Sequence, residues 1–290
     1  MPYVQTNDTR FGEPVSLFYQ DLQGNAAAGT TNTQPTLVFI HGWPLSHEMW
    51  DNQTLFFAER GFRCVAYDRR GFGKSSKPWG GYDYDTFADD LKAVIDELAL
   101  TNVVLVGFSM GGGEVARYFG HHGGANVTKV VLISSVTPFM LKTNDNEDGV
   151  PQEVFDGMLT DIEKDRFAFL ESFGKQFYGV SLISHPVSQA HLNHDTLLAS
   201  LASPKATLDC ARAFSATDFR TDVRAINVPV LIIHGDADQT VPLEASGEKT
   251  HKLLPQATYT VYKGEPHGLY ITAKDRLNQD LLAFLDQPAH

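Results

Sequence analysis

The amino-acid sequence predicts an α/β fold, with a mostly parallel sheet of eight strands flanked by helices. Runs rich in valine, isoleucine and leucine recur along the chain, and amphipathic helical patterns separate most of them. The later runs are almost continuously apolar, which is typical of strands buried on both faces of a parallel sheet. Their alternation with helices indicates right-handed crossover connections. At 290 residues, 42% hydrophobic and 20% charged, the chain has an ordinary globular composition and can form a large core.

The expected strands begin with an antiparallel pair and continue with buried runs. The run 15–19 alternates between apolar and polar residues, and 3–6 is its expected partner. The buried strands are expected at 36–40, 63–67, 102–106, 129–133, 228–233 and 257–262. Helices are expected between them, most clearly at 86–98, where apolar residues recur at helical spacing, then after a glycine cluster at 114–119, and at 276–285.

One long interval interrupts the alternation of strands and helices. No strand pattern occurs from about Pro138 to Val223, whereas 151–173 has a helical pattern with Pro151 in its first turn. Further helical segments lie near 187–202 and 204–216. We therefore expect residues 138–221 to form a helical cap inserted into an α/β core built from 1–137 and 222–290.

Charge and cysteine content exclude several classes of protein. The chain has 23 basic and 35 acidic residues, a net charge of −12, which disfavours nucleic acid and anionic membranes as partners. No apolar run approaches the roughly 20 residues of a membrane helix, and the first residues show no secretory signal pattern. Cys64 and Cys210 are expected to be free thiols in a reducing compartment, so we expect a cytoplasmic protein. An acidic surface is compatible with a monomer or a homo-oligomer.

The most informative segment is 103–114, VVLVGFSMGGGE. It is an apolar strand followed by Gly-Phe-Ser-Met-Gly and then a helix, which is the context that a G-x-S-x-G nucleophile elbow requires. Such a turn would lift the hydroxyl of Ser109 above the end of the sheet. At this helix N-terminus the backbone N–H of Met110 is free to stabilise an oxyanion. A capping serine in a glycine-rich turn is the simpler alternative.

A serine nucleophile needs a base and an acid, which follow it along the chain in this type of fold. His267 in GEPHGL follows the last expected strand, where a loop can reach back over the sheet. The segment after the preceding strand, HGDADQTVP, offers two carboxylates, Asp236 and Asp238. Spacing alone does not choose between them, and the other one is expected to cap the turn.

A second oxyanion donor should come from the loop after the strand 36–40. HGWPL lies there, and the candidate is the backbone N–H of Trp43, because Pro44 has none. His41 and His234 are expected to be structural residues that support their loops.

Other motifs do not support a cofactor or a metal. GFGKSS resembles the end of a phosphate-binding loop, but Asp68 occupies the position of the required first glycine. The dinucleotide pattern G-x-G-x-x-G and the haem-attachment pattern C-x-x-C-H are absent from the sequence. His191, His194 and Asp195 lie in the expected cap without a firm third ligand, and 121–122 is a histidine pair typical of a helix end. We therefore expect neither a cofactor nor a metal.

Several longer segments resemble the cofactor-free (non-haem) chloroperoxidases, arylesterases and γ-lactamases of the α/β-hydrolase superfamily. The resemblance covers essentially the whole chain and includes HGWPLSHEMWDNQ, YDRRGFGKSSKPWGGYDYDTFADDL, GFSMGGGEVARY, SVTPFM, DGVPQEVFDG and HGDADQTVP. It implies an α/β-hydrolase fold, with Ser109 as nucleophile, His267 as base and Asp238 as acid. It also implies an oxyanion hole from Trp43 and Met110. The substrate pocket that it implies is lined by Trp43, Phe108, Val136, Met140, Phe155, Phe169, Thr240 and Leu243.

The resemblance also implies an activity. Ser109 would attack a small aromatic or short-chain ester and form an acyl-enzyme. Hydrogen peroxide can replace water in this family, so that a carboxylic acid and H2O2 give a peracid, which oxidises halide away from the enzyme. Pro44 matches peroxidase-like members, where it would aim the Trp43 carbonyl toward the peroxide. The alternatives are hydrolysis of a bicyclic γ-lactam, a lyase or C–C hydrolase with the same residues, and a non-catalytic binding protein.

Overall fold

The sheet carries eight strands in the computed structural model, which describes residues 2–12, 14–24 and 34–287. The strands are β1 (Tyr3–Gln5), β2 (Ser16–Leu22), β3 (Thr36–Ile40), β4 (Cys64–Tyr67), β5 (Val103–Phe108), β6 (Val127–Ile133), β7 (Val230–Gly235) and β8 (Thr258–Tyr262). Their order across the sheet is β1-β2-β4-β3-β5-β6-β7-β8. The pairs β1–β2 and β2–β4 are antiparallel, and the other neighbouring pairs in this sheet are parallel. The predicted mostly parallel, eight-stranded sheet is confirmed.

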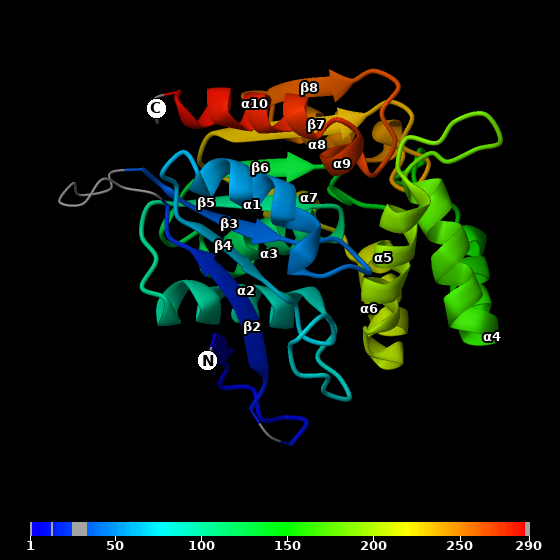
Figure 1. Ribbon diagram of the computed structural model, residues 1–290, viewed down its shortest axis with the longest axis horizontal. Helices are drawn as coiled ribbons and strands as arrows, with labels where there is room; N and C mark the ends of the chain where they lie inside the picture. The colour runs from blue at the N-terminus through cyan, green and yellow to red at the C-terminus, as the bar shows by residue number, and fades with distance from the viewer. Residues whose placement is uncertain (1, 13, 25–33, 288–290) are drawn as a thin grey trace.

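Helices cover both faces of this sheet (Figure 1). On one face lie α1 (Asp51–Ala58) and α10 (Lys274–Leu285), and on the other lie α2 (Tyr84–Glu97), α3 (Met110–His122) and α8 (Gly247–Leu253). A hydrophobic core lies on each face of the sheet, and successive residues of a strand point alternately into one core and the other. Phe39 and Val106 pack toward α1 and α10, whereas Val38 and Leu105 pack toward α2 and α3. The central strands are apolar throughout because they are buried on both sides.

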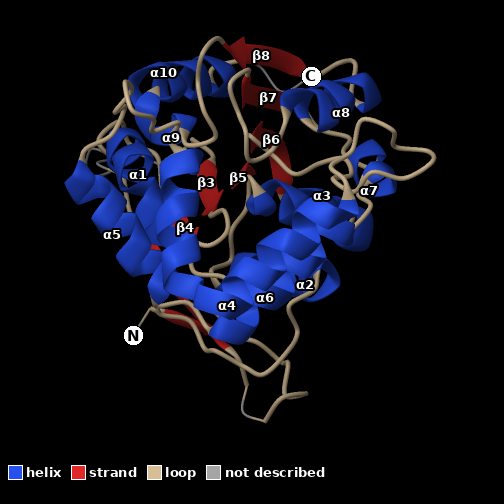
Figure 2. Cartoon of the chain, turned by 90° about the vertical axis from the view of Figure 1, so that its right-hand side faces the viewer, coloured by secondary structure: helices blue, strands red, loops and turns tan. Residues whose placement is uncertain are grey.

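The interval between β6 and β7 is helical, as the sequence predicts. It contains α4 (Gln152–Phe177), α5 (Gln189–Ser200), α6 (Pro204–Ala216) and the short α7 (Arg220–Arg224). The first three gather beyond the carboxyl ends of the strands, and Figure 2 shows them in front of the sheet. Pro151 is the N-cap of α4, one position before the expected first turn. The limits 138–221 of the cap stay a prediction.

Both cysteines are buried and unpaired, which confirms the expected free thiols. Burial raises the pKa of the Cys64 thiol to about 12. In the described ranges, the helices fall short of the length and apolar composition that crossing a lipid bilayer requires. The cytoplasmic location and the oligomeric state stay predictions.

Candidate active site

Ser109 lies in a sharp turn between β5 and α3. Its backbone has φ 53° and ψ −119°, a conformation that L-residues rarely adopt and that costs about 1–3 kcal/mol. The flanking glycines make the turn possible. A Cβ on Gly107 would lie 2.7 Å from the carbonyl oxygen of Gly111, and a Cβ on Gly111 would lie 2.5 Å from the carbonyl oxygen of Ile40. The turn is therefore the strained strand-to-helix elbow that the G-x-S-x-G pattern predicts.

The structure brings Ser109, His267 and Asp238 into one hydrogen-bonded chain. His267 lies in the loop after β8, and its Nε2 is 3.0 Å from Oγ of Ser109. Its Nδ1 is 2.6 Å from Oδ2 of Asp238, which follows β7. All three residues are buried. Of the two carboxylates that spacing left open, Asp238 is the one beside the imidazole. Asp236 is exposed and accepts the backbone N–H of Gly264, as expected for a turn residue.

The surroundings of Asp238 favour its ionised form. Burial alone would raise the pKa of this carboxyl, but the facing His267 and the side chain of His234 outweigh it and hold the pKa below its usual 3.8. Backbone N–H groups of Thr240 and Val241 also donate to Oδ1, at 2.9 and 2.8 Å. The carboxylate can therefore hold the proton of His267 on Nδ1 and leave Nε2 free to accept a proton from Ser109.

Aromatic rings fix the plane of the His267 imidazole. Phe108 and Phe177 pack against it with ring centroids 4.8 and 4.7 Å away. The backbone N–H of Gly268 donates to the carbonyl oxygen of Phe177 at 2.8 Å, which ties the histidine loop to the end of α4. His267 is 1% exposed, so its imidazole is shielded from bulk water.

The two expected oxyanion donors belong to chain segments next to Ser109. Met110 is the first residue of α3, so its N–H has no acceptor within the helix. The chain that leads into Trp43 passes directly against the elbow, since a Cβ on Gly42 would lie 3.1 Å from the Cβ of Ser109. Trp43 and Ser109 line the same cavity.

Comparison with known proteins identifies the family of this chain. Residues 35–274 match the family described as alpha/beta hydrolase fold. The chain belongs to this family. Since the matched segment runs from β3 to the start of α10, it includes the elbow and the loops that carry Asp238 and His267.

Similarity to individual proteins indicates which group within the family the chain belongs to. The hydrolase is 42% identical to a non-heme chloroperoxidase from Burkholderia pyrrocinia, over 98% of this chain and 99% of the relative. It is also 42% identical to a bifunctional esterase/perhydrolase from Acinetobacter calcoaceticus, over 98% and 99% of the two chains. The crystal structure of a bromoperoxidase from Bacillus anthracis aligns with a TM-score of 0.90 and 43% identity, covering 98% and 99%. The hydrolase is thus an enzyme of the non-heme chloroperoxidase group.

A cavity of about 410 Å³ opens above Ser109, between the sheet and the helices α4 and α6. Six of the expected pocket residues line it: Trp43, Val136, Met140, Phe155, Phe169 and Thr240. Sequence reasoning missed several others, above all Phe173, one turn after Phe169, and Phe214 on α6. Both rings contact Trp43, at centroid distances of 5.2 and 5.6 Å. The helical i, i+4 spacing of Phe169 and Phe173 was a usable signal.

Two expected pocket residues lie elsewhere in the structure. Phe108 ends β5 and points away from the cavity, into the core beneath His267, because neighbouring residues of a strand face opposite sides. Leu243 lies in the short 3-10 helix Leu243–Ala245 and is buried, while Val241 and Pro242, just before it, line the cavity.

A buried ionic network supports the turn before Trp43. Arg69 donates from Nη2 to the carbonyl oxygen of His41 at 2.9 Å and from Nε to Glu114 at 2.8 Å. Tyr67 donates to the other oxygen of Glu114. The ring of His41 accepts the backbone N–H of Arg69 at 2.9 Å. Burial, aided by the charge of Arg69, lowers the pKa of His41 to about 3, so this ring is neutral and structural, as expected. Sequence reasoning missed this network, although Glu114 stands out as a charge after three glycines.

The remaining polar motifs have structural partners. Asp68, which interrupts the phosphate-loop pattern, accepts hydrogen bonds from the backbone N–H groups of His47 and Lys74 at 2.7 and 2.8 Å. Its carboxylate thus occupies N–H donors of this loop. His234 donates from Nε2 to the carbonyl oxygen of Val241 at 2.9 Å, in line with its expected supporting role. His191 contacts the hydroxyl of Tyr178 at 3.1 Å.

Proposed function

We propose that this hydrolase cleaves small carboxylic esters through a covalent acyl-enzyme on Ser109. The observation that carries the proposal is the unbroken hydrogen-bonded chain from Asp238 through His267 to Ser109, at 2.6 and 3.0 Å. A serine hydroxyl becomes a useful nucleophile only with such a base at hand. The aromatic lining of the 410 Å³ cavity suits small aromatic or short-chain groups.

The first half-reaction would transfer the acyl group to the enzyme. His267 takes the hydroxyl proton on Nε2 as Oγ of Ser109 attacks the ester carbonyl, and the carboxylate of Asp238 stabilises the resulting imidazolium. The tetrahedral oxyanion accepts hydrogen bonds from the N–H groups of Trp43 and Met110. Each such donor is worth about 2.7–4 kcal/mol of transition-state stabilisation. His267 then returns the proton to the departing alcohol.

In the second half-reaction, a small nucleophile would release the acyl group. Water, deprotonated by His267, gives the carboxylic acid and restores Ser109. Hydrogen peroxide in the place of water gives a peracid by the same transfer. The free peracid can then oxidise a halide, returning the carboxylic acid and hypohalous acid. The Acinetobacter calcoaceticus relative is a bifunctional esterase/perhydrolase, which supports both outcomes for this chain.

Substitution of Ser109 tests this proposal. We expect Ser109→Ala to lower kcat for p-nitrophenyl acetate by about 10⁴–10⁶-fold. Ser215→Ala is a matched control, because Ser215 is also buried but binds only the carbonyl oxygen of Arg212 and does not line the cavity. Bromination of a phenol with acetate, H2O2 and bromide should likewise disappear in Ser109→Ala. Esterase activity that survives this substitution would contradict the proposal.

A further inference from the structure

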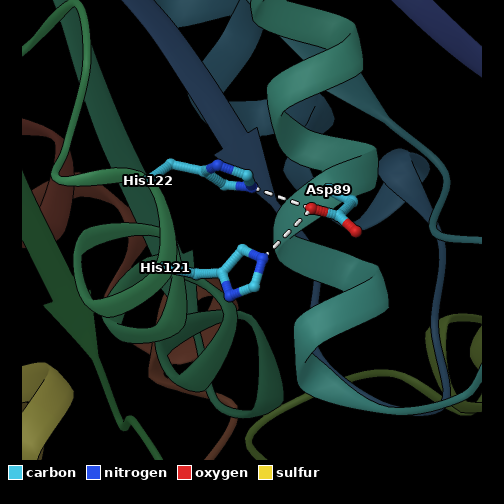
Figure 3. Close-up of side chains that lie close together, drawn as sticks. All are labelled: Asp89, His121 and His122. Carbon is cyan, nitrogen blue, oxygen red and sulfur yellow. Dashed lines mark hydrogen bonds and ion pairs between the residues drawn. The ribbon is translucent and has the colours of Figure 1, made fainter.

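Three potential metal ligands converge where the end of α3 meets α2, at the opposite end of α3 from Ser109 (Figure 3). Nε2 of His122 is 2.9 Å from Oδ1 of Asp89, and Nε2 of His121 is 3.5 Å from the same oxygen. One ligand atom from each residue lies within 4.8 Å of the other two. We propose that Asp89, His121 and His122 form a surface site for a divalent transition-metal ion, with Zn²⁺ as its first candidate.

Two consecutive residues of a helix, here His121 and His122, do not usually point toward the same partner. Successive helical residues point about 100° apart, so neighbours in sequence do not normally face one partner. Here α3 ends at His122, and Gly123 follows in the left-handed conformation, with φ 65°. The two imidazole planes stand at 87°, with centroids 4.6 Å apart, and both Nε2 atoms face Asp89. The ring of His122 also packs against Tyr118, which restricts its rotation.

The donor set matches the chemistry of zinc and its neighbours. Two imidazole nitrogens and a carboxylate oxygen suit Zn²⁺, Cu²⁺ and Ni²⁺, whereas Mg²⁺ and Ca²⁺ prefer oxygen alone. Ligands about 2.0–2.2 Å from a tetrahedral Zn²⁺ lie roughly 3.4 Å from one another. The distances of 2.9 and 3.5 Å between the Nε2 atoms and Oδ1 are close to that value. Asp89 is 59% exposed and His121 43% exposed, so water can complete the coordination.

The charges nearby do not compete for Asp89. Arg117, one turn before His121, is paired with Asp85 and Asp222. Lys92, one turn after Asp89 on α2, is paired with Asp96. Asp89 therefore keeps its negative charge available for a cation. A bound ion would join α2 to the helix that begins directly after Ser109, and it would stabilise the folded chain in proportion to its occupancy.

Calorimetric titration of ZnCl2 into tag-free, chelator-treated protein tests the site. We expect saturable binding of one ion per chain. In His122→Ala and Asp89→Asn the affinity should fall at least about 10- to 100-fold, the range that loss of a mere outer-shell partner costs, or binding should disappear. His194→Ala is a matched control. His191, His194 and Asp195 have the same composition, but their ligand atoms do not form such a group among the described residues. Thermal unfolding with EDTA checks that each variant is folded, and with Zn²⁺ it should show a rise in Tm only where the site is intact. Absence of saturable binding, or binding lost in His194→Ala but kept in His122→Ala, would overturn the proposal.

Discussion

Replacing Asp238 with asparagine should move the ring proton of His267 from Nδ1 to Nε2 while keeping the shape of the site. Oδ1 of Asp238 accepts two backbone N–H groups, from Thr240 and Val241, at 2.9 and 2.8 Å. The amide oxygen of asparagine must stay in that position, so its NH2 group replaces Oδ2, 2.6 Å from Nδ1 of His267. Nδ1 then has to accept, and the ring proton moves to Nε2. The imidazole would present a donor to Oγ of Ser109, 3.0 Å away, and could not act as its base.

The opposite amide orientation does not rescue the base. It would place the NH2 group against two N–H donors and leave both without an acceptor, and for the buried N–H of Val241 alone this costs about 1–3 kcal/mol. The loss at the half-buried N–H of Thr240 adds to this penalty, so the total exceeds what one restored hydrogen bond to the imidazole returns, about 0.5–1.5 kcal/mol. The wrong tautomer in a serine protease costs about 10⁴ in kcat, and each factor of ten corresponds to about 1.4 kcal/mol. We therefore expect a loss of about 10³–10⁵ in kcat for Asp238→Asn.

Steady-state hydrolysis of p-nitrophenyl acetate measures this loss. KM should change little, because Asp238 does not line the cavity. Asp236→Asn is the matched control, since Asp236 lies two residues away on the same turn but contacts only the N–H of Gly264. Its kcat should stay within about threefold of wild type, well below a catalytic effect. An Asp238→Asn enzyme that keeps a tenth of the wild-type kcat, or an equal loss in Asp236→Asn, would refute the reasoning.

Three further predictions concern strain, pH and the choice of nucleophile. Ser109→Gly should have a higher Tm than Ser109→Ala, because φ 53° at this position strains alanine but not glycine; an equal or lower Tm would contradict the strained elbow. Although burial opposes ionisation of Asp68, hydrogen bonds from His47 outweigh it and hold its pKa below 3.8. The stability from this carboxylate is therefore fully present above the unfolded-state value and lost as pH falls below it. Urea unfolding at pH 7 and at about pH 3, below the unfolded-state value, should accordingly show a smaller loss of stability for Asp68→Asn than for wild type; equal losses in the two proteins would contradict this role of Asp68. Pro44→Leu should lower the ratio of peracid formation to ester hydrolysis. An unchanged or higher ratio would show that Pro44 does not favour peracid formation.

Most of the fold was accessible from the sequence because its signals are local. The continuous apolar runs follow from burial on both sheet faces, and the elbow at Ser109 needs its glycines within two residues on either side. The choice between Asp236 and Asp238 was not local. Both follow the same strand, and only the path of the His267 loop decides which carboxylate meets the imidazole.

The pocket and its support were harder to predict, since they depend on contacts between distant segments. Phe108 was misplaced because the residue before the nucleophile still belongs to the strand and faces the core. The support of the turn at His41 joins Arg69 and Glu114, which lie 45 residues apart in sequence. No spacing rule connects them, although a lone buried charge after a glycine cluster must find a partner.

The most direct test of the central claim, that His267 activates Ser109, is labelling with a fluorophosphonate probe followed by peptide mapping. The account predicts one adduct per chain, located on Ser109, and a labelling rate about 10³-fold or more lower in His267→Gln. Labelling at another residue, or labelling of Ser109 at the wild-type rate without the imidazole, would contradict it.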